Sequence, residues 1–254
     1  MNYRTKELTA AAARSLLAEP ELAELVVVDN ASDDGSADYL RRALDDARVQ
    51  VVESSENLGF GQGVNLGAAR TTAPLLMLLN SDAELVAGSL GRLADELRAA
   101  PRLGVAAPLI LGHDGRAQVD AFGVFPSYAA FALRTNRRPP DRLEPDWVSG
   151  VAMAVRRTAF DEVGGFDPAF WMYLEDVDLC RRLSDAGWGI RRCTSAVVLH
   201  LGQASAWSSA QRERQYHDSL LVYLERGSYP HWQVRGFGLA HRGWQRWRHR
   251  AGQA

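Results

Sequence analysis

Short apolar runs alternate with helix-forming segments through the first 110 residues, and this alternation is the feature that most constrains the fold. The apolar runs are "ELVVVDN" (24–30), "VQVVES" (49–54), "PLLMLL" (74–79) and "GVAAPLIL" (104–111). Segments with helical spacing or many small residues lie between them, at 36–47, 63–72 and 87–101. Strands that are apolar throughout belong to sheets covered on both faces. The order therefore predicts an α/β fold with a mostly parallel sheet flanked by helices.

The second half of the chain is less regular. Residues 112–146 show few clean periods, and "RRPP" at 137–140 favours a loop. A helix is expected over "EDVDLCRRLSDAGW" (175–188), a strand over "AVVLHLG" (196–202), and helical structure from residue 205 onward. No internal repeat is present.

Composition excludes several classes of protein. A net charge of −2 gives no overall basic field that would draw the chain to nucleic acid. Cys180 and Cys193 form no C-x-x-C pair, so we expect both to be reduced, which suits the cytoplasm. The longest apolar run, "APLLMLL", is too short to span a bilayer, and the opening residues carry charges where a signal peptide would be apolar.

Acidic residues follow two of the predicted strands. Asp29 ends the first apolar run, and Asp82 follows the third within "NSDAEL". Ligands of open α/β sheets bind at the carboxyl ends of strands, where an acid can hold Mg²⁺ or Mn²⁺. A plainer interpretation stays open for each: Asp29 begins a turn in which Ser32 or Asp33 caps the next helix, and Asp82 is a loop acid.

Two further features carry weak signals. The segment "NLGFGQGVN" (57–65) is rich in glycine and could approach phosphates, but it matches no register of G-x-G-x-x-G. His200 ends an apolar strand, where a histidine is more often structural than a ligand. The other five histidines show no zinc-site spacing.

Three acids stand together in "FWMYLEDVDLCRRL" (170–183). On a helical wheel that starts at residue 175, Asp178 lies on the polar side, near Arg181 and Arg182, and pairs with arginine. Asp176 lies among Leu179, Cys180 and Leu183, and Glu175 lies at the edge of that arc. The wheel therefore predicts that Asp176 points into the fold, where burial would raise its pKa and suit it to act as a general base.

The motifs together resemble glycosyltransferase family 2, which has the GT-A fold, and in particular its bacterial rhamnosyltransferase-like branch. The matching pieces occur in family order from residue 25 to about 205: "VVVDNASDDGS", "ENLGFGQGVNLGAAR", "LLMLLNSDAEL", the stretch from "WVSGVAMAV" to "EDVDLCRRLSDAGW", and "VVLHLGQAS". The resemblance implies a donor-binding half at 1–111, an acceptor and catalytic half at 112–204, and a basic helical extension at 205–254.

The resemblance also implies roles for individual residues. Asp176 would be the catalytic base. The metal ligands would be Asp82 and His200, holding Mg²⁺ or Mn²⁺, although Asn80 replaces the first acid of the family's D-x-D motif. The residues expected to contact the donor are Asp29, Asn30, Asn57, Gly59, Asn65 and Asn80. The residues expected near the acceptor are Glu175, Trp147 and Gly150.

The implied reaction is an inverting transfer of a sugar, by single displacement, from dTDP-L-rhamnose to a cell-envelope or lipid-linked glycan. Three alternatives stay open. One is a UDP- or GDP-sugar donor, and another is a non-catalytic module that binds sugar nucleotides or glycans. The third is a glycoside hydrolase, which needs two carboxylates roughly 5 to 9.5 Å apart.

The two ends of the chain raise further expectations. Family members begin with an apolar strand that leads into the equivalent of "NYR", so the first central strand is expected to be missing here, with a natural start upstream of Met1. Residues 226–254 carry six arginines, three histidines and no acid. This tail could lie on the inner face of the cell membrane as an interfacial helix, or it could dock on the domain.

Overall fold

The computed structural model describes residues 1–126, 143–202, 208–227, 234 and 236. The expected "RRPP" loop and nearly all of the tail after residue 227 fall outside these residues. Within them, no helix has both the length and the apolar character needed to cross a bilayer.

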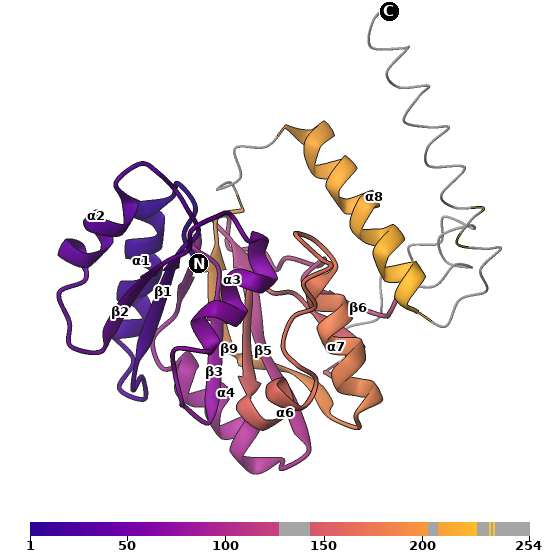
Figure 1. Ribbon diagram of the computed structural model, residues 1–254. Coiled ribbons are helices and arrows are strands. Elements are labelled where there is room, and N and C mark those ends of the chain that lie inside the picture. The colour runs from indigo at the N-terminus through magenta and orange to yellow at the C-terminus, as the bar shows by residue number, and fades with distance from the viewer. Residues whose placement is uncertain (127–142, 203–207, 228–233, 235, 237–254) are drawn as a thin grey trace, which may run out of the picture.

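Strands and helices alternate through the first half of the chain, as the apolar runs predicted (Figure 1). They are, in order, α1 (Lys6–Leu17), β1 (Leu25–Asp29), α2 (Ser36–Ala43), β2 (Val49–Glu53), α3 (Gly59–Ala68), β3 (Leu75–Leu79), β4 (Ala83–Leu85), α4 (Ser89–Ala99) and β5 (Leu103–Gly112). The second half contains β6 (Phe122–Gly123), β7 (Trp147–Val148), β8 (Ala152–Arg156), α6 (Arg157–Glu162), α7 (Glu175–Asp185), β9 (Gly189–His200) and α8 (Ser209–Arg226).

The strands form a five-stranded sheet in the order β3-β8-β5-β9-β4 and two smaller pairs, β1-β2 and β6-β7. The α/β class is confirmed, but the sheet is mixed rather than mostly parallel. β5–β9 and β1–β2 are parallel, whereas β8 runs antiparallel to β3 and β5, and β4 runs antiparallel to β9. An apolar run indicates that a strand is buried, but it does not indicate the direction of the strand. The sequence therefore contained no signal for the antiparallel strands.

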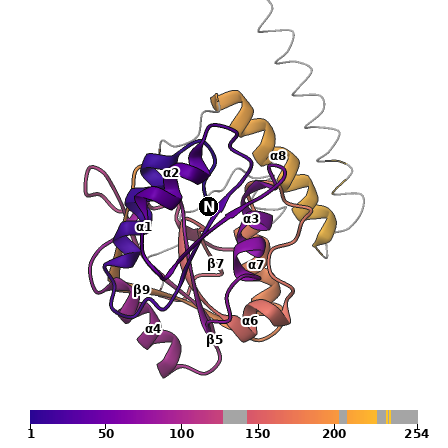
Figure 2. The same ribbon diagram turned by 60° about the vertical axis from the view of Figure 1, so that its left-hand side comes forward.

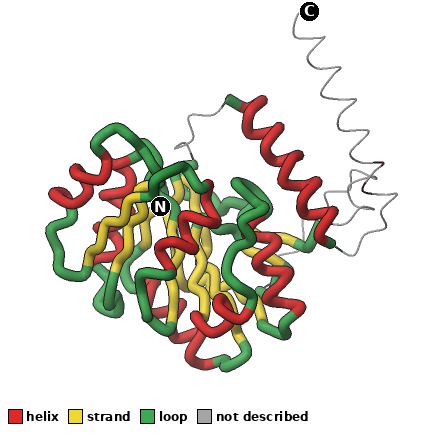
Figure 3. Tube along the Cα trace, viewed as in Figure 1, coloured by secondary structure: helices red, strands yellow, loops and turns green. Residues whose placement is uncertain are grey.

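Helices cover both faces of the five-stranded sheet (Figures 2 and 3). Side chains of α3, α6 and α7 pack with Val105, Met153 and Val155 on one face. On the other face, Leu93 and Leu97 of α4 pack with Ala106 and with strand β9. Successive residues of β5 and β8 thus point to opposite faces, and both faces are apolar because both are covered.

No strand among the described residues pairs with both β1 and β3, and the expectation of a missing central strand stays a prediction. Asn2 alone makes an isolated parallel bridge, to Asp29 at the end of β1. The expected boundary at residues 111 and 112 falls at the end of β5, and the sheet combines strands from both sides of it. The division into donor and acceptor halves stays a prediction.

Arg157 joins the end of α3 to the start of β3. Its guanidinium donates to the carbonyl oxygens of Thr71 at 2.8 Å, Ala68 at 3.0 Å and Ala73 at 3.1 Å. The three bonds come from three different nitrogens of the planar guanidinium, whereas an ammonium group carries all its donors on one atom and cannot reproduce this spacing.

We expect Arg157→Lys to lower the free energy of unfolding by about 2–3 kcal/mol, because partly buried carbonyls lose their donors. Chemical denaturation with guanidinium chloride would measure this. The matched control is Arg98→Lys, since the Arg98 side chain is 61% exposed and pairs with Asp95, and it should change stability by less than about 0.5 kcal/mol. Equal effects of the two variants would contradict this role.

Candidate active site

The first part of the candidate site is built at the carboxyl end of β1. Asp29 is buried and accepts hydrogen bonds from the side chains of Asn2 (2.6 Å) and Ser32 (2.5 Å). Ser32 is therefore not the expected helix cap. Gly35 occupies that position, and neither Ser32 nor Asp33 makes a capping bond to α2. The interpretation of Ser32 or Asp33 as the cap of the next helix is therefore wrong, because the polar side chains at the end of β1 form hydrogen bonds with one another.

The buried amide of Asn30 fixes the glycine-rich segment. Its Nδ2 donates to Asn57 Oδ1 at 2.9 Å and to the Gly59 carbonyl at 3.2 Å, and its Oδ1 accepts from the Leu58 N–H at 3.0 Å. Gly59 has a φ of +77°, and a Cβ there would lie 2.0 Å from the Trp171 carbonyl oxygen. Only glycine fits this position. The expected donor residues Asn30, Asn57 and Gly59 thus form one connected unit.

Asn65 has a different position. Its side chain donates to the Phe166 carbonyl at 2.8 Å and accepts from the Phe166 N–H at 2.9 Å. Both ends of this amide therefore hold the segment before α7. A direct contact between Asn65 and the donor stays a prediction.

The "NSD" turn lies at the end of β3, where Asp82 faces His200. His200 Nε2 is 3.3 Å from Asp82 Oδ1, and its Nδ1 is 2.9 Å from Gln118 Oε1. Ala83 of β4 pairs with His200 of β9, and this register places the side chain of the preceding residue, Asp82, beside His200. Gln118 was not identified from the sequence, because it is 82 residues from His200 and carries no motif.

Asp82 and His200 could hold a divalent cation. A partner on Nδ1 orients the imidazole and leaves Nε2 toward the acid, as metal-binding histidines require. Carboxylate oxygen and imidazole nitrogen suit Mn²⁺ better than Mg²⁺, which prefers oxygen alone. In the part of the chain that the structure describes, no group of three or more His, Cys, Asp or Glu side chains could hold a metal ion. Diphosphate oxygens and water would have to complete the coordination.

The start of α7 is strained, and it carries the acid pair. Tyr173 and Leu174, directly before the helix, have φ values of +69° and +64°. Such angles in residues other than glycine are costly and occur often at functional sites. They aim the first turn of α7 so that Asp176 Oδ2 accepts from the Gly150 N–H, and Oδ1 from the Val177 N–H, both at 2.8 Å.

The helix begins at Glu175 as the wheel assumed, but the predicted order of burial is wrong. Glu175 is 7% exposed and Asp178 5%, whereas Asp176 is only partly buried. Asp178 does pair with Arg182, at 2.7 Å, but beneath the surface rather than on a solvated face. A helical wheel assumes that only one side of the helix is buried. In the structure, α8 and neighbouring loops also cover the other side of the first turn of α7.

Glu175 and Asp176 differ in how their charges are supported. Glu175 Oε2 is buried and has no hydrogen-bond partner among the described residues. Burial together with the Asp176 charge raises the pKa of Glu175 to about 8. Burial also raises the pKa of Asp176, but two backbone N–H bonds favour its ionised form. Adjacent carboxyls in one site cannot both ionise easily. The backbone N–H bonds to Asp176 and the burial of Glu175 therefore favour an ionised Asp176 beside a protonated Glu175.

One short loop joins these parts of the site. The Gly150 N–H binds Asp176, and the Val151 carbonyl accepts from the Asn80 N–H at 2.9 Å. A Cβ on Gly150 would lie 2.9 Å from Phe60 at the start of α3. Trp147, on β7 before this loop, donates from Nε1 to the Val124 carbonyl at 2.9 Å. Contacts of Trp147 and Gly150 with an acceptor stay predictions.

Helix α8 adds residues to the site that no sequence motif identifies. Burial raises the pKa of the Tyr216 hydroxyl, and the Asp176 charge raises it further. Tyr216 also meets Tyr173 edge-to-face at 6.3 Å, and Ser219 donates to the Met172 carbonyl at 2.6 Å. About 40 residues separate Tyr216 from the acid pair, and no pattern connects them.

Comparison with known proteins identifies the family. Residues 2–164 match the family described as Glycosyl transferase family 2, and residues 142–203 match the N-terminal domain of galactosyltransferase. The chain belongs to glycosyltransferase family 2. It is therefore a glycosyltransferase, and the resemblance inferred from the sequence motifs is confirmed.

Curated relatives agree with this assignment. The N-acetylglucosaminyl-diphospho-decaprenol L-rhamnosyltransferase of Mycobacterium tuberculosis is 31% identical over 240 residues, covering 82% of this chain and 76% of the relative. The rhamnosyltransferase WbbL of Escherichia coli is 37% identical over 82 residues, covering 32% of this chain and 31% of the relative.

Solved structures share the fold of this glycosyltransferase. The mannosyltransferase PcManGT of Pyrobaculum calidifontis, in complex with GDP-Man and Mn²⁺, superposes with a TM-score of 0.64 at 17% identity over 90% of this chain. GalNAc-T7 with UDP, GalNAc and Mn²⁺ gives 0.57 at 18% identity over 79% of this chain. The chain spans 64% and 42% of the lengths of these two structures. At such identities the likeness shows the GT-A-like fold.

The protonation of Glu175 makes stability depend on pH. The folded state keeps this proton up to a pKa of about 8, whereas the ordinary value is 4.5. The contribution of this proton to the free energy of unfolding is therefore fully present below pH 4.5, falls as the pH rises, and is lost above about pH 8. Between pH 5 and 8.5 we expect the wild type to lose about 2–4 kcal/mol more unfolding free energy than Glu175→Gln.

Urea denaturation at several pH values would measure this difference. The control is Glu84→Gln, because Glu84 is an exposed acid on β4 and its loss should leave the wild-type slope unchanged. Parallel slopes for the wild type and Glu175→Gln would show that Glu175 is ionised in the folded protein.

Proposed function

We propose that this family 2 glycosyltransferase moves L-rhamnose from dTDP-L-rhamnose to a sugar on a lipid-linked diphosphate, with inversion at the anomeric carbon. The similarity to the decaprenol-linked rhamnosyltransferase of Mycobacterium tuberculosis, over most of both chains, supports this choice of donor and acceptor. The observation that carries the mechanism is the partly buried, doubly hydrogen-bonded Asp176 beside Glu175, whose pKa is raised by burial and by the Asp176 charge.

In the proposed step, Asp176 accepts the proton of the acceptor hydroxyl as that oxygen attacks the anomeric carbon. The bond from this carbon to the diphosphate breaks, and the nucleoside diphosphate leaves with the electron pair. Hydrogen bonds to Gly150 and Val177 aim both carboxylate oxygens, and burial raises the pKa of Asp176 toward the range of a useful base. Glu175, protonated, can donate a hydrogen bond to the acceptor.

The donor would lie along the carboxyl ends of β1 and β3. Asp29 and Asn30 would contact the base and ribose, with Asn57, Gly59 and Asn65 in the second donor segment and Asn80 beside the diphosphate. Asp82 and His200 would hold the divalent cation, which supplies charge stabilisation for the leaving diphosphate. The Mn²⁺ in two structures of the same fold supports a metal in this role.

The acceptor would approach from the side of Glu175, Trp147 and Gly150. A lipid-linked acceptor would require the enzyme to work at a membrane surface. The proposed membrane contact through residues 226–254 falls almost wholly outside the described residues.

The two adjacent acids allow a direct test of the base. Asp176→Asn should lower kcat by about 10³-fold, since a general base contributes 10²–10⁴-fold, while dTDP binding stays within about twofold of the wild type. The matched variant Glu175→Gln keeps a hydrogen-bond donor and should retain far more activity. Rhamnose transfer to a synthetic prenyl-diphosphate acceptor would be followed by mass spectrometry. Greater loss in Glu175→Gln than in Asp176→Asn would refute the assignment.

The metal assignment predicts a separate effect on binding. Calorimetry should show dTDP binding at least about tenfold more tightly with Mn²⁺ than without it, because a bound cation screens the diphosphate charge. Asp82→Asn should remove most of this difference, whereas the control Glu84→Gln, on the exposed side of β4, should keep it. A metal effect that survives Asp82→Asn would contradict the proposed site.

A further inference from the structure

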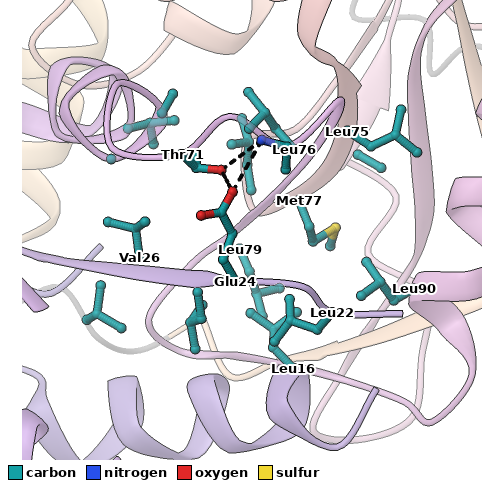
Figure 4. Close-up of a pocket in the computed structure, with 18 of the residues that line it drawn as sticks. Leu16, Leu22, Glu24, Val26, Thr71, Leu75, Leu76, Met77, Leu79 and Leu90 are labelled. Atoms are coloured by element: carbon teal, nitrogen blue, oxygen red, sulfur yellow. Dashed lines mark hydrogen bonds between the residues drawn. The ribbon is translucent and has the colours of Figure 1, made fainter. Parts of the chain in front are cut away.

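An apolar cavity of about 380 Å³ lies between β1 and β3 (Figure 4). At the start of the two strands, the Glu24 carboxylate accepts hydrogen bonds from the Thr71 hydroxyl and from the N–H groups of Thr72 and Ala73. Neither acid of the pair at the start of α7 lines this cavity, and its mainly apolar walls would leave sugar hydroxyls without partners. A sugar that reacts at Asp176 is therefore held elsewhere.

Helix α8 has an apolar face that is buried at one end and exposed at the other. Tyr216, Leu220 and Tyr223 have the spacing of neighbours on one face of a helix. Leu220 and Tyr223 are 0% and 2% exposed and pack with Phe170 and Val177. One turn earlier, Tyr216 is 38% exposed. The apolar face of α8 thus continues beyond the part that the domain covers.

Two hydrogen bonds hold α8 against α7 and the segment before it. The Ser219 hydroxyl donates to the Met172 carbonyl at 2.6 Å, and Arg181 Nε, on α7, donates to the Tyr223 hydroxyl at 2.6 Å. Ser219 is buried and lies one turn after Tyr216. The fold therefore fixes where the exposed ring of Tyr216 lies.

That position is beside the residues that lead into the acid pair. The Tyr216 ring meets the Tyr173 ring edge-to-face, with centroids 6.3 Å apart and an angle of 62° between the rings. Tyr173 comes two residues before Glu175, and its φ of +69° belongs to the turn that starts α7. Burial raises the pKa of the Tyr216 hydroxyl, and the Asp176 charge raises it further. The two rings thus border the approach to Asp176.

An edge-to-face pair suits a pyranose ring. The edge of one ring covers a single face of the other, so the remaining ring faces are free of this contact. The face of an aromatic ring carries partial negative charge and attracts the weakly positive C–H groups on one side of a sugar. The hydroxyls of the sugar then stay available for polar groups, such as the carboxyls of Glu175 and Asp176.

We propose that Tyr173 and Tyr216 form an aromatic platform that binds the sugar ring of the acceptor and turns its reacting hydroxyl toward Asp176. This inference rests on the proposed function, because it requires a sugar acceptor at the acid pair. The tyrosines position the sugar and take no part in the proton transfer. One ring comes from the turn before α7 and the other from α8, so the platform is complete only when α8 is docked.

The kinetic test compares Tyr216→Leu, which keeps an apolar side chain without a flat face, with Tyr216→Phe, which keeps the ring. Tyr216→Leu should raise the KM for the acceptor about tenfold, with kcat and the KM for the donor within about twofold of the wild type. Tyr216→Phe should restore the KM for the acceptor to within about twofold of the wild type. The control is Tyr39→Leu, which removes a partly buried tyrosine from α2 and should leave that KM unchanged.

Three kinetic results would overturn the platform. They are an unchanged KM for the acceptor in Tyr216→Leu, an equal rise in Tyr39→Leu, and an equal rise in the KM values for donor and acceptor.

A second measurement does not depend on sugar transfer. In deuterated protein with protonated tyrosine rings, NMR saturation of those rings should pass to the C–H protons of the sugar on the synthetic prenyl-diphosphate acceptor. Tyr216→Leu should lose most of this signal. Rhamnose transfer without the signal would overturn the platform and leave the proposed function standing. The signal without rhamnose transfer would support the platform and overturn the proposed reaction, and the absence of both would overturn both.

Discussion

The hydrogen bond from the Gly150 N–H to the Asp176 carboxylate is the contact on which the candidate site depends. It fixes the acid against a loop whose next residue, Val151, holds the "NSD" turn through Asn80. The same glycine leaves room for Phe60 at the start of α3, next to the segment that Asn30 holds in place. Segments from four parts of the chain are thereby brought to one edge of the sheet. A Cβ at position 150 would lie 2.9 Å from Phe60, so the Phe60 ring would have to shift.

Electrostatics gives the two neighbouring acids different roles. Burial and the Asp176 charge raise the pKa of Glu175 to about 8, and its Oε2 finds no hydrogen-bond partner among the described residues, so its protonated form is favoured. Asp176 is more accessible and receives two backbone N–H bonds, which an anion needs. Separation of the pKa values of two close carboxyls is a common way to obtain a base beside a hydrogen-bond donor at neutral pH. The left-handed backbone of Tyr173 and Leu174 sets the positions of both acids.

The sequence predicted those elements whose signals are local. The apolar runs located β1, β2, β3 and β5, and the ordered motifs identified the family that the comparisons confirm. Strand direction was missed at β8, because apolar runs do not encode it. The helical wheel selected Asp176 but predicted it to be more buried than Glu175, whereas Glu175 is the more buried of the two. The wheel describes α7 alone and does not include α8, which covers the segment before α7. Gln118 and Tyr216 reach the site only through long-range packing, for which no short motif exists.

The proposed mechanism depends on which acid of the pair holds a proton, and carbon-13 NMR of the labelled side-chain carboxyls observes this directly. At pH 7 the Glu175 carboxyl should resonate as a protonated acid and titrate near pH 8. The Asp176 carboxyl should resonate as a carboxylate at the same pH. An ionised Glu175 beside a protonated Asp176 at pH 7 would contradict the proposed mechanism, because Asp176 could then not accept the proton of the acceptor hydroxyl.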